Sequence, residues 1–224
     1  MKLMLVSDFT QIKHSLPSTA LICVFIVVVM TISMGTPVAG AAAIAAMLSY
    51  IVIYSVLAND EAAGWAKLRD TLPLSRRDIV LGRFAGTFIV SIAGCALAIV
   101  LALAVSVVMV ALGMDDVIKE MGGLETTMVI TALSGVIGTA FSLIMLSLIL
   151  PIVMRLGLTR TSRIIPIIFV LAVCLFFALG PGYLDVVLDE SMLPLLCVGV
   201  IVIALVLFVI SALVTSKLYE AREF

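Results

Sequence analysis

The chain is divided into six apolar runs that contain no Asp, Glu, Lys, Arg or His. A helix needs about 20 residues to cross about 30 Å of hydrocarbon, and each run comes close to that length or exceeds it. The six runs are residues 18–36, 37–58, 84–112, 126–151, 164–180 and 194–215. We therefore expect an all-α integral membrane protein with six transmembrane helices.

The charged residues lie in short clusters between these runs, so loops are expected to alternate with helices. Hydrophobic residues make up 64% of the chain and charged residues 12%, against about 45–50% and about 25% in soluble domains. One transmembrane domain over residues 1–224, in contact with the lipid bilayer, accounts for this composition. The net charge of -1 gives no indication of a nucleic-acid partner, and we expect none.

The basic residues indicate the orientation. If the N-terminus is cytoplasmic, twelve of the thirteen Lys and Arg residues fall on the cytoplasmic side, and Lys119 is the exception. Cytoplasmic loops of membrane proteins carry an excess of Lys and Arg. The pattern predicts a multi-pass protein of the cell membrane with both termini in the cytoplasm.

Residues 1–17 precede the first run and contain apolar residues at helical spacing, which favours an interfacial helix on the inner leaflet. These residues are Leu5, Phe9, Ile12 and Leu16. One alternative is a frayed cytosolic tail. Another is a signal peptide cleaved near Val38-Ala39-Gly40, where small residues occur.

Two junctions between runs contain helix-breaking residues. Gly35-Thr36-Pro37 divides the first two runs, which predicts a helical hairpin and not one helix of twice the membrane thickness. Gly180-Pro181-Gly182 follows the short fifth run, and apolar residues at helical spacing come after it. Residues 164–193 therefore read either as a span alone or as a span plus a surface or re-entrant helix.

Ionisable groups that could drive transport or catalysis are missing from the apolar runs. Ion-coupled carriers generally keep such groups in the membrane. The single histidine, His14, lies beside Lys13 outside the runs, and no phosphate-binding loop of the G-x-x-x-x-G-K-[ST] type occurs. The four cysteines lie in apolar runs and read as small hydrophobic residues. We expect no enzyme activity, no metal and no cofactor in this chain, and an energy source in another subunit.

Residues 59–83, with the sequence NDEAAGWAKLRDTLPLSRRDIVLGR, form the most informative segment. Asn59 or Asp60 is expected to cap a short helix that Pro73 ends. Its apolar stripe is Trp65, Leu68 and Leu72.

A second helix is expected to begin directly after this corner. Ser75 and Asp78 have the spacing of a capping box, so this helix should start at Arg76 and run into the third span. Two helices joined at a fixed corner suit docking to a cytosolic partner. The alternative is an interfacial helix anchored by Trp65 at headgroup depth.

This segment resembles the signature of the bacterial ABC-2 type permease family, which has D-E-x-x-x-W, then L-P-[VL]-S-R-[KR]-[DE]-I-V, then a basic residue. The matching residues are Asp60-Glu61, Trp65, Leu72-Pro73-Leu74-Ser75-Arg76-Arg77-Asp78-Ile79-Val80 and Arg83. The six-run layout and the leader residues Asp8, Phe9, Gln11, Ile12 and Lys13 also agree with the family.

The resemblance implies a permease that dimerises with itself or with a related permease. It also implies two cytosolic ABC ATPase subunits, which would hold ATP and magnesium, and a coupling helix between the second and third spans that meets them. The residues implied in coupling are Asp60, Glu61, Trp65, Leu68, Leu72, Pro73, Ser75, Arg76, Arg77 and Asp78.

Small residues at four-residue spacing predict close helix contacts, because they let backbones approach. They are Gly82 and Gly86 near the third run, and Ser134, Gly138 and Ser142 in the fourth. The spacing is compatible with contacts inside one chain and with contacts across a dimer.

The function expected from these features is export powered by a separate ATPase. Apolar spans offer no counter-charge to a charged solute, which favours an apolar or amphipathic cargo such as a peptide, lipid or drug. Hydroxyls such as Ser91, Ser106, Thr139 and Ser142 could also line the path. The alternative is a non-transporting membrane protein, with an immunity or regulatory role, that binds another membrane complex.

Overall fold

The computed structural model describes residues 18–19, 21–31, 33, 36–64, 76–113, 119, 123–161, 167 and 193–220. The regular structure in this part of the chain is helical. The elements are α2 (Pro37–Ala62), α4 (Arg76–Ala111), α6 (Leu124–Leu156), α7 (Leu158–Thr161) and α9 (Leu193–Glu220), with a shorter apolar helix, Leu21–Thr31, before α2.

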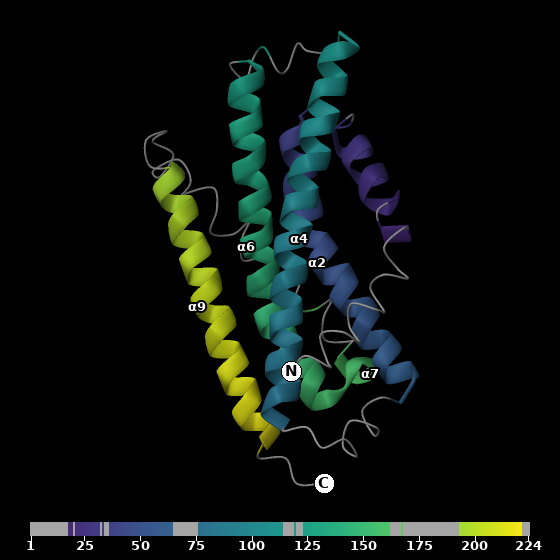
Figure 1. Ribbon diagram of the computed structural model, residues 1–224, viewed down its shortest axis with the longest axis vertical. Helices are drawn as coiled ribbons and strands as arrows, with labels where there is room; N and C mark the ends of the chain where they lie inside the picture. Colours follow the sequence, from purple (N-terminus) through teal and green to yellow (C-terminus); the bar gives the residue numbers. More distant parts are fainter. Residues whose placement is uncertain are drawn as a thin grey trace.

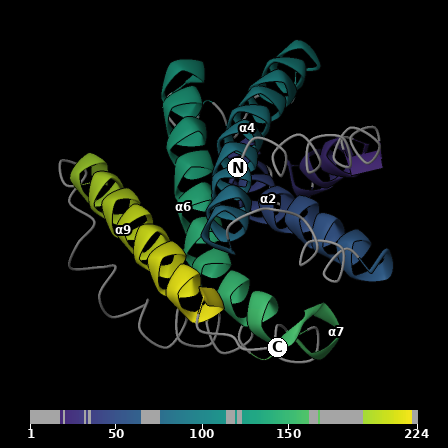
Figure 2. The same cartoon turned by 60° about the horizontal axis from the view of Figure 1, so that its bottom comes forward.

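The long helices form a bundle (Figure 1). The last turns of α2, α6 and α9 and the first turn of α4 lie at one end, where α7 also lies, and we call this the α7 end. The last turn of α4 and the first turn of α6 lie at the opposite end. Figure 2 brings the α7 end forward and shows α7 beside the last turns of α6.

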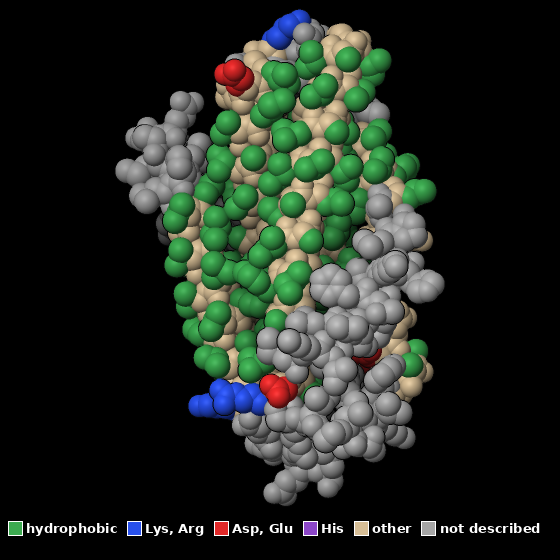
Figure 3. Space-filling model, in the orientation of Figure 1, with side chains coloured by type: hydrophobic (Ala, Val, Ile, Leu, Met, Phe, Trp, Pro, Cys, Tyr) green, Lys and Arg blue, Asp and Glu red, His purple; other side chains and the backbone are tan. Residues whose placement is uncertain are grey.

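Four of these helices, α2, α4, α6 and α9, are long and apolar enough to cross a membrane. Apolar side chains cover the face in Figure 3, and charged side chains appear at its two ends. Valines such as Val100, Val107 and Val206 are at least half exposed. A surface of this kind suits a hydrocarbon solvent and would be costly in water.

The predicted spans over 37–58, 84–112, 126–151 and 194–215 correspond to α2, α4, α6 and α9. Within the first run, the structure describes the helix Leu21–Thr31. The run 164–180 falls outside the described residues except for position 167, as do the predicted interfacial helix over 1–17 and most of 164–193. The six-span count and the orientation remain predictions.

The first two runs form two helices, as the turn signals predict. Thr36 is the N-cap of α2, with extended φ and ψ of -127° and 135°, and Pro37 follows in the first turn. A Cβ placed on Gly40 would lie 3.5 Å from Thr31 Oγ1 and 3.6 Å from Val27 Cα. The helix Leu21–Thr31 therefore folds back against the first turns of α2.

One predicted helix boundary is wrong. Asn59 and Asp60 do not cap a separate helix, because α2 continues through both residues to Ala62. Alanine favours the helix, and the backbone first turns left-handed at Gly64, where φ is 66°. Helix α4 is described from Arg76 onward, and Ser75 of the proposed capping box lies outside the described residues, so the predicted start of this helix stays a prediction.

The small residues predicted in the fourth run bring the backbones of α2 and α6 into close contact. The Ser134 hydroxyl donates to the Val38 carbonyl at 3.0 Å. One turn further along α6, Gly138 packs so closely on the Ala42 carbonyl that a Cβ at this position would collide with it. This contact lies within one chain. Of the other small residues, Gly82, Gly86 and Ser142 are buried.

Helix α9 packs on α4 and α6. The Phe208 ring lies 5.2 Å from the Phe84 ring and 6.2 Å from the Phe88 ring, measured between centroids. The Ser211 hydroxyl donates to the Ser147 carbonyl of α6 at 2.5 Å. Aromatic packing and one interhelical hydrogen bond thus place α9 beside the α7 end of the bundle.

Candidate functional site

Asp60, in the last turn of α2, forms an ion pair with Arg83, in the first third of α4. Arg83 Nη2 donates to Asp60 Oδ2. Both residues are buried, with 7% of Asp60 and 1% of Arg83 exposed. Because a charge removed from water requires a partner, this pair ties the end of α2 to α4.

Glu61, the next residue, turns its carboxylate toward the first turn of α7. Its Oε2 accepts from the Leu158 N–H at 2.5 Å, and the Thr159 N–H lies 3.2 Å from both carboxylate oxygens. The Thr159 hydroxyl also donates to Oε1. The first N–H groups of a helix have no intrahelical partner, and a carboxylate beside them is favourable. Glu61 therefore caps α7 from a residue 97 positions earlier in the chain.

The turn between α6 and α7 depends on Gly157. Its φ of 81° and ψ of 162° lie in a region open essentially to glycine alone. The Gly157 N–H donates to the Val153 carbonyl at 2.9 Å, which ends α6, and its own carbonyl accepts from Thr161. This turn directs the first N–H groups of α7 toward Glu61.

An apolar contact lies next to these polar ones. Leu158 is buried against Ile149 and Val153 of α6, and Tyr54 and Leu57 of α2 pack on the same cluster. The ends of α2 and α6 and the short α7 are thus held together by both apolar and polar contacts.

We call these contacts the polar junction. It consists of Asp60, Glu61, Arg83, Leu158 and Thr159. Through it, two adjacent acidic residues connect α2 to two different elements. Asp60 connects it to α4, and Glu61 connects it to α7.

The other residues predicted for coupling lie around the junction or outside the described part. Arg77 and Asp78 are exposed in the first turns of α4, where the Asp78 carboxylate suits the helix N-terminus. Arg76 is the first residue of α4. Trp65, Leu68, Leu72, Pro73 and Ser75 fall within residues 65–75, outside the described residues. The junction thus flanks the whole segment that carries the motif.

Three partner residues at this site did not follow from local sequence reasoning. Arg83 entered only as a basic residue of the motif, although a lone charge directly before the uncharged run 84–112 is a signal for a paired residue. For Leu158 and Thr159 the sequence offered a weaker signal. Gly157 directly precedes them, and glycine commonly ends a helix.

The hydroxyls considered as path-lining groups are buried and donate to carbonyls of their own helices. The acceptors are Thr87 for Ser91, Ala102 for Ser106, Gly135 for Thr139 and Thr139 for Ser142. In this conformation each of these hydroxyls therefore already donates its hydrogen within its own helix. Among the described residues, no group of three or more His, Cys, Asp or Glu could hold a metal ion.

A family model described as ABC-2 family transporter protein matches residues 3–220, nearly the whole chain. Searches of curated proteins and of solved structures give no match. The match covers the polar junction, the motif segment that it flanks and all four helices long enough to cross a membrane. The chain is a multi-pass cell-membrane protein that belongs to the ABC-2 transporter family.

Proposed function

We propose that the chain is the transmembrane permease subunit of an ATP-binding cassette exporter. The observation that carries this proposal is the polar junction, which attaches the bundle to both ends of the segment that holds the family motif. A segment anchored in this way can transmit a push to the helices. The chain has no phosphate-binding loop, so ATP hydrolysis is assigned to a separate ATPase subunit.

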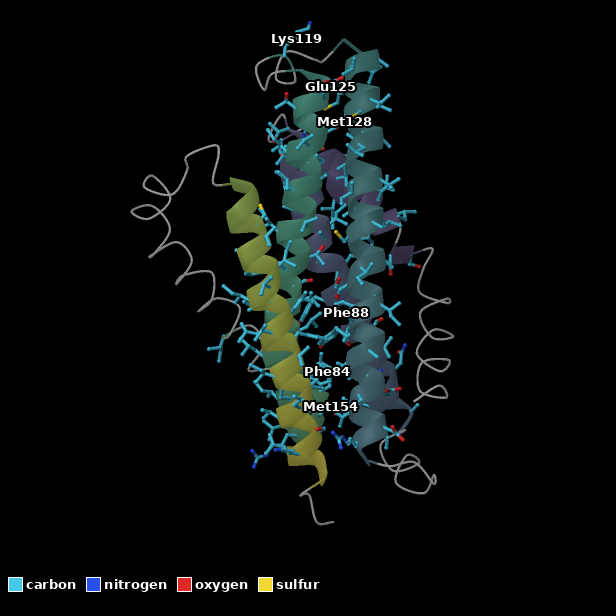
Figure 4. The ribbon with its side chains drawn as sticks, turned by 60° about the vertical axis from the view of Figure 1, so that its left-hand side comes forward. Phe84, Phe88, Lys119, Glu125, Met128 and Met154 are labelled. Atoms are coloured by element: carbon cyan, nitrogen blue, oxygen red, sulfur yellow. The ribbon has the colours of Figure 1, made fainter. Side chains whose placement is uncertain are left out.

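The α7 end is proposed to face the cytoplasm. Arg77 at the start of α4, Arg155 in the last turn of α6 and Lys217 in the last turn of α9 support this orientation. Lys119 lies at the opposite end, near Glu125 (Figure 4). The difference in Lys and Arg between the two ends agrees with the positive-inside rule. The ATPase would then meet the α7 end.

Coupling is assigned to the segment between α2 and α4, with Trp65 and the sequence from Leu72 to Asp78 as the contact to the ATPase. Arg77 is exposed at its end and available to a partner surface. Asp60 is buried by its pairing with Arg83, so its role is to hold the segment in place. A push on the segment would rock two permease halves between inward-open and outward-open states. The second half is another copy or a related permease.

The proposed cargo is apolar or amphipathic. The apolar runs carry no charged residue, and Arg83, which directly precedes the third run, is paired with Asp60. The buried hydroxyls of α4 and α6 donate within their own helices. A strongly charged solute would thus find no counter-charge in the apolar runs of this chain.

The test is co-purification with the ATPase followed by transport in vesicles. Trp65→Ala and Arg77→Ala should reduce ATPase binding while the protein still inserts, and Glu125→Ala at the opposite end serves as the matched control. Vesicles with both subunits should move an amphipathic fluorescent solute only with hydrolysable ATP. A chain that binds no ATPase and moves no solute would refute the proposal and favour the immunity or regulatory role.

A further inference from the structure

We propose that the contact between Glu61 and α7 is a latch that opens during transport, whereas the Asp60–Arg83 pair is a clamp that stays closed. This inference rests on the proposed function. It would make the α7 end the place where α2 and α6 separate, with α2 and the start of α4 moving as one unit.

The free energy needed to separate an acidic residue from its partner differs between Asp60 and Glu61. Asp60 and Arg83 are almost fully buried, and parting them would leave two uncompensated charges out of water. Such a pair resists opening. Glu61 and Thr159 are both exposed, so water can replace each hydrogen bond between them when they part. The Glu61 contact is therefore the one that can open and close repeatedly.

The position of α7 supports the same division. Helix α7 contacts α6 more extensively than it contacts α2, and Gly157 joins it directly to α6. Among the described residues, the hydrogen bonds between α7 and α2 end on the Glu61 carboxylate. When those bonds break, α7 stays with α6.

The opposite part of α2 supplies a pivot for this movement. Val38 and Ala42, in its first turns, contact Ser134 and Gly138 of α6 through backbone atoms and one hydrogen bond. From Ala42 to Glu61 the helix rises about 28 Å, at roughly 1.5 Å per residue. A small rotation about this contact thus produces a large displacement at Glu61.

The remaining contacts between α2 and α6 are apolar and oppose such a rotation weakly. Residues such as Leu48 and Val52 of α2 lie in one buried cluster with Leu143 and Leu146 of α6. In a bilayer, lipid chains can replace these contacts, so separating apolar helix faces costs less than it would in water. The rotation of α2 relative to α6 is then controlled by two contacts. These are the exposed polar latch at one end of α2 and the close backbone contact at the other.

Thiol crosslinking tests the latch directly. In a chain whose four native cysteines are replaced by Ala, Glu61→Cys and Thr159→Cys would be joined by a short, reducible bifunctional thiol reagent. A second pair, Val38→Cys with Ser134→Cys, is the matched control at the pivot. Both pairs would be measured in proteoliposomes with the ATPase, without nucleotide and with a non-hydrolysable ATP analogue.

We expect the 61–159 pair to crosslink readily without nucleotide and several-fold less with the ATP analogue. The crosslinked protein should still bind the ATPase subunit but should no longer transport. Reduction of the crosslink should restore transport. The 38–134 pair should crosslink equally in both conditions and leave transport intact. Equal crosslinking of the 61–159 pair in both conditions, or full transport by its crosslinked form, would overturn the latch.

Glu61→Gln separates the latch from a purely structural role. It keeps the side-chain shape and weakens the acceptor, so thiol labelling of Thr159→Cys should rise without nucleotide and respond less to the ATP analogue. Unchanged labelling would contradict the latch. The chain whose four native cysteines are replaced by Ala tests the proposed function separately. If this chain does not transport with the ATPase, the exporter assignment is refuted before any latch variant is compared.

Discussion

Asp60 and Arg83 form a buried ion pair between the last turn of α2 and the first third of α4. The two residues are the first and the last residue of the ABC-2 motif, so the pair connects both ends of the segment that carries it to the bundle. The motif therefore includes residues with two kinds of role. Its first acid and last base build the scaffold, and exposed residues such as Arg77 remain available to a partner.

Breaking the ion pair should destabilise the protein strongly. Asp60→Asn or Arg83→Gln leaves one buried charge without its partner, and we expect a loss of about 3–5 kcal/mol. Thermal unfolding in detergent, followed by size-exclusion chromatography, measures the effect. The double variant Asp60→Leu with Arg83→Leu should recover much of the loss, since no charge remains buried.

Arg77→Gln is the matched control for the ion-pair variants, because Arg77 is exposed on the same helix. We expect a change below about 0.5 kcal/mol. If Arg77→Gln and Arg83→Gln lowered the free energy of unfolding equally, the buried ion pair would contribute no more to stability than an exposed arginine.

Removing the cap on α7 should have a smaller effect. Glu61→Gln weakens the bonds to the N–H groups of Leu158 and Thr159, and loss of a helix cap costs about 0.5–2 kcal/mol. We expect the lower half of this range because the site is exposed. Glu125→Gln, which changes an exposed acid in the first turn of α6, should change stability less, because Glu125 makes no hydrogen bond or ion pair with another helix of the described part. Hydrogen exchange of the α7 amides should rise in Glu61→Gln only.

Adding a methyl group at Gly138 should separate α2 from α6. The new Cβ would collide with the Ala42 carbonyl, and backbone cannot move aside as a flexible side chain can. Overpacking of this kind costs about 1–3 kcal/mol. Gly199→Ala in α9 is the matched control, because nothing lies within 4 Å of its Cβ position and alanine favours the helix by about 0.8–1 kcal/mol. The two variants should thus shift the unfolding temperature in opposite directions.

Gly157→Ala should disturb the turn before α7. A side chain at φ 81° and ψ 162° is strained, at a cost of about 1–3 kcal/mol. We expect lower thermal stability and greater protease sensitivity near residue 157. Gly157→Asn should not rescue the protein, since asparagine tolerates left-handed helical angles and not this region. Full stability of either variant would show that the turn can adopt other angles.

Helix content and helix position could be predicted largely from local patterns. Apolar runs without charges placed α2, α4, α6 and α9, because a helix is the conformation that satisfies its own backbone in hydrocarbon. The capping box of Ser75 and Asp78 predicts a helix from Arg76, and the residues from Arg76 to Ala111 are helical. The end of α2 was missed because Asp60 resembles a helix cap in sequence, whereas its long-range partner Arg83 keeps it inside the helix.

By itself, the sequence determined the family, the apolar helices and the small residues suited to close packing. These depend on residue type and short-range spacing. Only the tertiary structure decided that Asp60 turns inward to Arg83, that Glu61 caps α7, and that Gly138 lies on Ala42. Each of these contacts joins residues 23 to 98 positions apart. Local patterns place a side chain on its helix, whereas its partner is set by the packing of the whole bundle.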